Sequence, residues 1–193
     1  MSSGLRHVYA QPMSDHPFEY IDQAVREGAD VLYIWGAAAD GLVKQKNMDL
    51  MKRTVDRMCG TGLPIGIAAH TAQVIVECEK AKLDVDFYQK TFHSRNYATA
   101  QKPDDQAEFG AYDNAWCRNA DEVIEIMKNV QRAWIAFNVM AAGAIPPREA
   151  FPYCFNSGAD FVLAGMFDFQ IEEDVWIAQK ALANVKRSRP WMA

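Results

Sequence analysis

One stretch of the sequence, residues 133–169, limits the possible fold more than any other part of the chain. An apolar run ends at the small residues 142–144, and an amphipathic segment begins at Pro146. A Gly-Ala-Asp turn at 158–160 follows, and a second apolar run ends at Gly165. This order predicts a strand, a loop, a helix, a tight turn and a second strand. Such a unit is typical of a parallel α/β protein.

The same alternation extends over the rest of the chain. Apolar runs predict strands at 6–10, 31–35, 64–69 and 85–91. Amphipathic segments predict helices at 17–27, 48–59, 119–130 and 171–185, and a further helix that begins after Thr71. The Gly-Ala-Asp turn at 158–160 also occurs at 28–30, each time between a helix and a strand. We therefore expect a single α/β domain over 1–193, with a long polar insertion at about 93–118.

The number of predicted strands indicates an incomplete barrel. About six βα units can be counted, whereas a closed TIM (βα) barrel has eight and typically about 250 residues. We expect a partial or N-terminally shortened TIM barrel, with its functional residues at the carboxyl ends of the strands. An open barrel leaves strand edges unpaired, which favours self-association, so a homo-oligomer is expected.

Charge and composition exclude several classes of partner. The net charge is −5, and the basic residues gather only near the C-terminus, where Lys186, Arg187 and Arg189 are expected to be solvated. Nucleic acid is therefore not expected as a partner, and no apolar run reaches the roughly 18 residues of a membrane helix. The N-terminus lacks the apolar region of a signal peptide. The four cysteines form no CxxC pair, so reduced thiols and a cytoplasmic setting are expected.

Several short motifs resemble those of a known group of proteins. They are Ala69-His70, Lys90-Thr91-Phe92-His93, the segment 113–117 (DNAWC), the loop 141–145 (AAGAI) and the ending 165–170 (GMFDFQ). With them, the region from about 29 to 185 resembles a group of bacterial TIM-barrel proteins of unassigned function. The resemblance implies the fold and leaves the activity open. This chain departs from the group at Ser94 and Arg95, in place of a histidine and an aspartate, and at Asn138, in place of a lysine.

Lys90 is the main candidate for covalent chemistry. Its strand is similar to the Schiff-base strand of deoxyribose-phosphate-type aldolases, which also combine a Lys-Thr pair with a later small-residue phosphate loop. A lysine at the barrel mouth that is shielded from water has its charged ammonium form destabilised. Its pKa therefore falls, and the neutral amine can act as a nucleophile. The alternative is a lysine whose side chain extends from the strand end to solvent.

His70 and His93 end two successive predicted strands, so their imidazoles are expected at the same face. Imidazoles there are suited to act as acid and base near neutral pH. With Asp113 or Asp168 they would instead form a divalent-metal site, the one cofactor that the sequence suggests. In the structural alternative, His70 caps the helix that begins at Thr71, and His93 opens the insertion at the surface.

Small residues after the last two strands are candidates for binding an anion. The main-chain N–H groups at Gly143 and Ala144, and at Gly165 and Met166, would face the ligand. The alternative is that small residues only allow a helix and a strand to pack closely. Among the acidic residues that follow, only Asp168 is expected to look into the barrel mouth. The others, Glu172, Glu173 and Asp174, are expected to complement the dipole of the last helix.

These observations lead to three hypotheses. The first is an aldolase, lyase or isomerase acting on a small phosphorylated or carboxylated substrate, with Lys90, His70 and His93 as catalytic residues. The second is a divalent-metal-dependent isomerase or hydrolase. The third is a non-catalytic, truncated barrel that self-assembles or binds a small anion, which the departures at Ser94, Arg95 and Asn138 favour.

Overall fold

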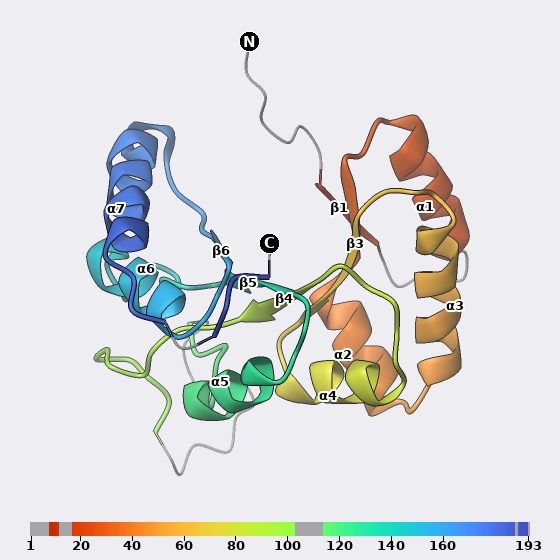
Figure 1. Cartoon of the computed structure of the whole chain (residues 1–193), viewed down its shortest axis with the longest axis horizontal. Coiled ribbons are helices and arrows are strands. Elements are labelled where there is room, and N and C mark those ends of the chain that lie inside the picture. Colours follow the sequence, from red (N-terminus) through yellow and green to blue (C-terminus); the bar gives the residue numbers. More distant parts are fainter. Residues whose placement is uncertain (1–7, 12–16, 103–113, 188, 193) are drawn as a thin grey trace. The chain divides into compact units, whose positions relative to one another are not determined.

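The computed structural model describes residues 8–11, 17–102, 114–187 and 189–192 (Figure 1). Strands and helices alternate along the chain, which confirms the α/β class. The chain forms two compact units, residues 1–89 and 90–193. None of the helices in the described ranges is long and apolar enough to cross a bilayer.

The first unit is a parallel sheet with helices between its strands. Its elements are β1 (Val8–Gln11), α1 (Pro17–Arg26), β2 (Val31–Ile34), α2 (Gly36–Lys44), α3 (Met48–Cys59), β3 (Ile65–Ala69) and α4 (Ala72–Lys80). The strands β1, β2 and β3 pair in parallel in this order. The helices α1 and α3 pack together (Figure 1).

The strand β3 forms the buried centre of this unit, since all five of its residues are buried. A glycine is required within it: a Cβ added at Gly66 would lie 2.3 Å from Cε2 of Phe87. The Phe87 ring therefore packs directly on the main chain of β3. This close approach accounts for a glycine in the middle of a strand, where it is otherwise unfavourable.

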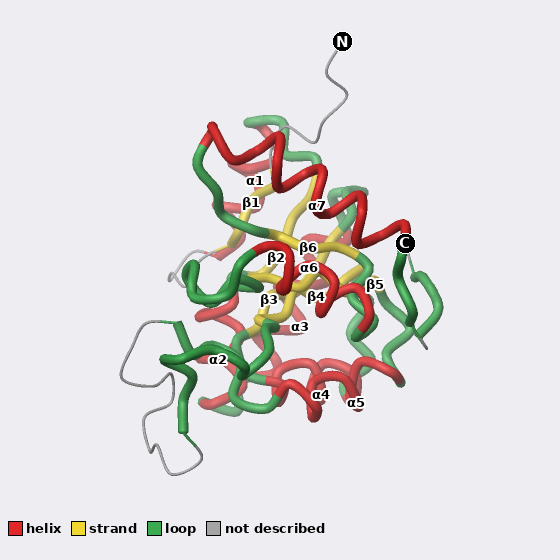
Figure 2. The backbone as a smooth tube through the Cα atoms, turned by 90° about the vertical axis from the view of Figure 1, so that its left-hand side faces the viewer, coloured by secondary structure: helices red, strands yellow, loops and turns green. Residues whose placement is uncertain are grey.

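The second unit continues the same alternation. The strand β4 (Phe87–Thr91) begins in the first unit and ends in the second, and it is followed by α5 (Ala120–Lys128), β5 (Ala133–Phe137), α6 (Pro147–Asn156), β6 (Phe161–Leu163), the short 3₁₀ helix η1 (Asp168–Gln170) and α7 (Ile171–Ala183). The strands β5 and β6 pair in parallel, and α6 packs along α7 (Figure 2). The Phe92 ring contacts those of Trp134 and Tyr153 in the core of this unit.

Two asparagine side chains cap helices in the structure. The Asn47 side chain accepts a hydrogen bond from Leu50 N at 3.2 Å at the start of α3. Asn119 does the same for Glu122 N at 3.1 Å at the start of α5. One helix was not expected: α2 carries two glycines, which disfavour helices, and only small residues on its buried side. Cys78, Cys117 and Cys154 are buried free thiols, whereas Cys59 is exposed.

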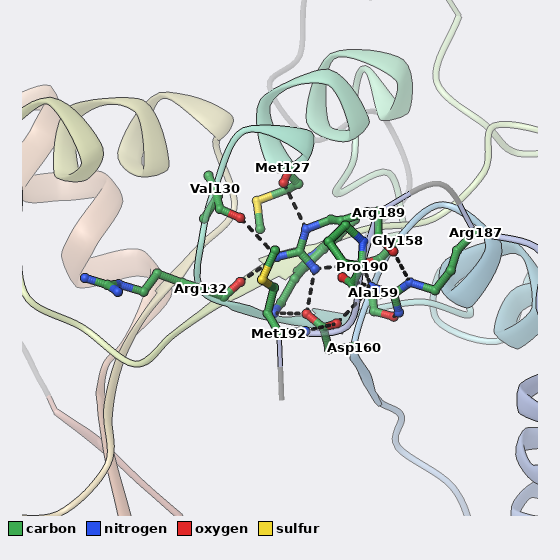
Figure 3. Close-up of polar contacts among 11 residues, drawn as sticks. Met127, Val130, Arg132, Gly158, Ala159, Asp160, Arg187, Arg189, Pro190 and Met192 are labelled. Carbon is green, nitrogen blue, oxygen red and sulfur yellow. Dashed lines mark hydrogen bonds and ion pairs between the residues drawn. The ribbon is translucent and has the colours of Figure 1, made fainter.

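The prediction for the basic C-terminal residues is wrong for two of the three. Arg187 and Arg189 are buried around the carboxylate of Asp160, and we call these three residues the tail cluster (Figure 3). Arg187 Nη2 lies 2.9 Å from Asp160 Oδ1, and Arg189 Nη1 lies 2.7 Å from Oδ2. Arg189 also donates to the main-chain oxygens of Met127, Val130, Arg132 and Gly158. Only Lys186 remains exposed as expected.

Candidate functional site

Lys90 lies near the end of β4 and is buried, with 1% of its surface exposed. Its Nζ donates hydrogen bonds to the main-chain oxygen of Thr91 at 2.9 Å and to Thr91 Oγ1 at 2.7 Å. The side chain therefore does not extend to solvent, which was the structural alternative for this residue. The Thr91 hydroxyl in turn donates to the main-chain oxygen of Trp116 at 3.0 Å.

His93 holds the segment at Trp116 and Cys117 in place. Its Nε2 accepts hydrogen bonds from Trp116 N at 3.1 Å and Cys117 N at 3.0 Å, and its Nδ1 lies 2.8 Å from the main-chain oxygen of Ser94. These partners assign the ring proton to Nδ1 and a neutral imidazole. Burial lowers the pKa of His93, the charge of Lys90 adds to this, and the bond to Ser94 opposes it. His93 is thus buried rather than at the surface, and the main chain engages both its nitrogens.

His70 follows β3 in the first unit and is held by Asp40 of α2. Asp40 Oδ2 accepts from His70 N at 3.0 Å and lies 2.8 Å from His70 Nδ1, while Oδ1 accepts from Thr71 N and Thr71 Oγ1. The ring also packs on Gly36, where an added Cβ would lie 3.0 Å from His70 Cε1. Asp40 therefore anchors the two residues that precede α4, whose first residue is Ala72.

The carboxylate of Asp40 is held in its ionised form. Burial opposes ionisation, but the hydrogen bonds from His70 and Thr71 outweigh it and lower the pKa of Asp40. Sequence reasoning missed this residue because α2 itself was not expected. An acidic residue in a small-residue segment after a strand was the only signal that could have indicated it.

The described residues do not assemble a metal site. No group of three His, Cys, Asp or Glu side chains that could hold a metal occurs in the described ranges. His70 belongs to the first unit, whereas His93 and Asp168 belong to the second. Asp168 is exposed in η1, and Asp113 lies outside the described residues.

A pocket of about 760 Å³ lies at the carboxyl ends of β5 and β6, wholly within the second unit. The loop after β5 and the loop after β6 both line it, and the lining includes Gly143, Gly165 and Met166. The two loops that the sequence predicted to act together therefore meet at one cavity. Ala144 is exposed and does not line the pocket.

The loop after β5 has an unusual main chain. Asn138, Ala141, Ala142 and Gly143 all have positive φ, between 47° and 86°. Asparagine adopts this conformation more readily than most residues, which gives a physical reason for Asn138 at this position. The amides of Gly143 and Ala144 donate within the loop, to Met140 O and Ala141 O at 2.9 and 3.2 Å. These two predicted anion donors are thus used by the loop itself.

The loop after β6 leaves its amides available. Over the described part of the chain, no hydrogen bond engages the N–H groups of Gly165 and Met166. The next amide, Phe167 N, donates to Gln170 Oε1 at 3.1 Å. Of the four predicted anion-binding residues, Gly165 and Met166 therefore remain as donors at the pocket.

The acidic residue that faces the pocket is not the one predicted. Asp168 is exposed, and its Oδ1 accepts from Phe169 N at 2.9 Å. Asp174, on the first turns of α7, lines the pocket and has 4% of its surface exposed. The expectation that only Asp168 looks into the barrel mouth is therefore wrong, because α7 begins at Ile171 and turns Asp174 inward.

Comparisons with known proteins give no family. No family model and no curated protein matches the chain. Among solved structures, the chain is similar to a probable 3-DHS dehydratase, AsbF, involved in petrobactin synthesis in Bacillus anthracis. The identity is 12% and the TM-score 0.42, over 94% of this chain and 71% of the other.

Proposed function

We propose that this chain is an enzyme of the aldolase or lyase type that acts on a small carbonyl substrate carrying a phosphate or carboxylate group. The observation that carries the proposal is the buried Lys90–Thr91 pair at the end of β4, next to the strand whose end opens into the pocket. Phe92 N, two residues after Lys90, donates to Phe137 O at 2.9 Å, and Phe137 lines the pocket.

The chemistry follows from a lysine kept away from water. Once Lys90 has lost its proton to solvent, its amine adds to the substrate carbonyl carbon, and the adduct takes up one proton as it loses water, which leaves a protonated imine. The cationic imine then accepts the electron pair of an adjacent C–C or C–H bond as that bond breaks, and the other fragment leaves as a carbonyl product or as a proton that passes to solvent. The Thr91 hydroxyl, 2.7 Å from Nζ, positions the amine. The anionic group would lie at the amides of Gly165 and Met166.

His93 enters the proposal as a positioning residue. It fixes the main chain at Trp116, and Trp116 O accepts from the same Thr91 hydroxyl that binds Nζ. A substrate that binds the Lys90 amine replaces the hydrogen bonds between Lys90 Nζ and Thr91. His70 and Asp40 form a separate pair in the first unit.

Borohydride trapping tests the proposal. The protein is incubated with small aldehydes and ketones that carry a phosphate or carboxylate, reduced with sodium borohydride, digested and analysed by mass spectrometry. We expect an adduct at Lys90 that disappears in Lys90→Arg, while the exposed Lys128 gives a matched control position. Adducts at Lys128 but none at Lys90 with every carbonyl tested would remove the proposal.

A second candidate function, self-assembly, is favoured by a separate observation. Ten large apolar side chains of residues 161–191 are exposed, among them Phe167 at 68% and Phe169 at 79%. The Phe167 and Phe169 rings stack with their centroids 5.4 Å apart, and contiguous exposed apolar surface of this kind marks protein–protein contacts. Light scattering tests this role: a dimer that dissociates in Phe169→Asp supports it, and a monomer at micromolar concentration contradicts it.

A further inference from the structure

Asp174 is a buried acidic residue for which the described part of the chain offers no hydrogen-bond or ion-pair partner. Only 4% of its surface is exposed, and no hydrogen bond or ion pair reaches its carboxylate from the described residues. Burying a charge without a partner is unfavourable, so buried carboxylates are normally paired or hydrogen-bonded. An unpartnered carboxylate in a pocket wall indicates a ligand group that the pocket is built to receive.

The remaining lining makes Asp174 distinctive. Of the 16 lining residues it is the only charged one, and most of the others are apolar or small, such as Phe137, Leu163 and Met166. A pocket of this composition carries a negative charge that no lysine or arginine in its wall offsets. It therefore favours a ligand that brings hydrogen-bond donors or positive charge to this point.

The helix dipole does not account for the inward position of Asp174. The first turn of α7 also carries Glu172 and Glu173, and both are exposed. These carboxylates interact with the N-terminal end of the helix without being buried. Their neighbour Asp174 points to the cavity instead, at a site where an apolar residue would pack without any penalty for burying a charge.

We infer that Asp174 binds an ammonium or hydroxyl group of the ligand, at a fixed distance from the anion that Gly165 and Met166 hold. This inference rests on the proposed function and narrows its substrate class. The substrate would be a small amino- or hydroxy-substituted phosphate or carboxylate. An ammonium would form a charge-assisted hydrogen bond with Asp174, and a hydroxyl would donate to the same oxygen atoms.

Calorimetric titration with three matched probes distinguishes an ammonium from a hydroxyl as the group that Asp174 binds. The probes are ethyl phosphate, 2-hydroxyethyl phosphate and O-phosphoethanolamine. They share the phosphate ester and differ only in carrying no donor, a hydroxyl or an ammonium. For the wild-type protein we expect at least one donor-bearing probe to bind about tenfold more tightly than ethyl phosphate, the factor typical of one hydrogen bond to a charged group. Asp174→Ala should remove this preference for either donor, and Asp174→Asn should remove it for the ammonium probe, whereas Glu172→Gln should preserve it.

The outcomes distinguish this inference from the proposed function. Equal affinity of all three probes would overturn the role of Asp174 while leaving the anion site in place. A preference that survives in Asp174→Ala would overturn it as well, as would a wild-type chain that binds none of the probes. Trapping at Lys90 is measured separately and does not depend on any of these results.

The melting temperature of the ligand-free protein tests whether Asp174 serves the fold and not a ligand. If Asp174 is present for a ligand, removing its buried charge does not destabilise the free protein. We expect Asp174→Asn to unfold at the same or a higher temperature than the wild type without added ligand. A fall of several degrees would show that the carboxylate serves the fold and would contradict the inference.

Discussion

Arg189 and Asp160 form a buried ion pair near the C-terminus, with Nη1 and Oδ2 2.7 Å apart and both side chains shielded from solvent. Asp160 also accepts from Trp134 N at 2.8 Å, at the start of β5. The pair therefore joins the last described residues to the beginning of β5 and the turn before β6 (Figure 3). This contact lies at the ends of these strands opposite to the pocket.

Removing the cation from this pair should destabilise the second unit strongly. Arg189→Ala leaves Asp160 buried with less compensation and frees several main-chain oxygens, so we expect a loss of about 3–5 kcal/mol. Lys186→Ala, an exposed neighbour in the same tail, should change the free energy of unfolding by less than about 0.5 kcal/mol. Chemical denaturation measures both, and similar values for the two variants would contradict the structural role of Arg189.

The tail cluster also predicts how stability depends on acid. Burial raises the pKa of Asp160, but hydrogen bonds from Trp134, Arg189 and Met192 outweigh it and the pKa is lowered from 3.8. A lowered pKa means that the stabilisation is present above pH 3.8 and is lost as the pH falls through the folded-state value. Asp160→Asn should be less stable at pH 7 and should lose less stability than the wild type between pH 5 and 2. Parallel acid profiles would contradict this.

The lowered pKa of His93 predicts a second pH dependence of stability, at higher pH than that of Asp160. The pKa of His93 is lowered from 6.5, so the folded protein favours the neutral ring. The stabilisation is complete above pH 6.5 and declines as the pH falls toward the folded-state value. His93→Gln, which keeps a hydrogen-bonding side chain without this titration, should show a smaller drop in melting temperature between pH 7.5 and 5. An unchanged drop would mean that His93 does not titrate with unfolding.

Asp40 is expected to contribute more to stability than a surface carboxylate. Its carboxylate accepts four hydrogen bonds from His70 and Thr71, so Asp40→Ala should cost about 2–3 kcal/mol of stability. Asp49→Ala, at an exposed position in the first turn of α3, is the matched control. Equal melting temperatures of the two variants would show that Asp40 contributes no more to stability than a surface carboxylate.

The sequence predicts the order of elements well because apolar periodicity and caps are local signals. Asn47 and Asn119 mark the starts of α3 and α5, and both side chains make capping bonds. The helix α2 carries neither signal, since its buried side consists of Gly36, Ala38 and Ala39. Its absence from the prediction also hid Asp40, the partner of His70.

The site was predicted less completely because side-chain direction depends on packing. Two adjacent acidic segments, at Asp168 and at 172–174, look alike in sequence, and only the start of α7 decides that Asp174 turns inward. Similarly, the basic residues near the C-terminus carry no local sign that Arg187 and Arg189 fold back onto Asp160, 27 and 29 residues earlier. Contacts between distant residues of this kind cannot be inferred from periodicity.

The most direct test of the account asks whether the pocket and Lys90 belong to one site. Gly165 lines the pocket, and a Cβ added there meets no atom within 4 Å, so Gly165→Phe should fill the cavity without distorting the main chain. The measurement is the rate at which a phosphorylated aldehyde forms a borohydride-trapped adduct at Lys90 in this variant and in the wild type. We predict that the rate falls at least about tenfold, which corresponds to roughly 1.4 kcal/mol. An unchanged rate at Lys90 would contradict the account.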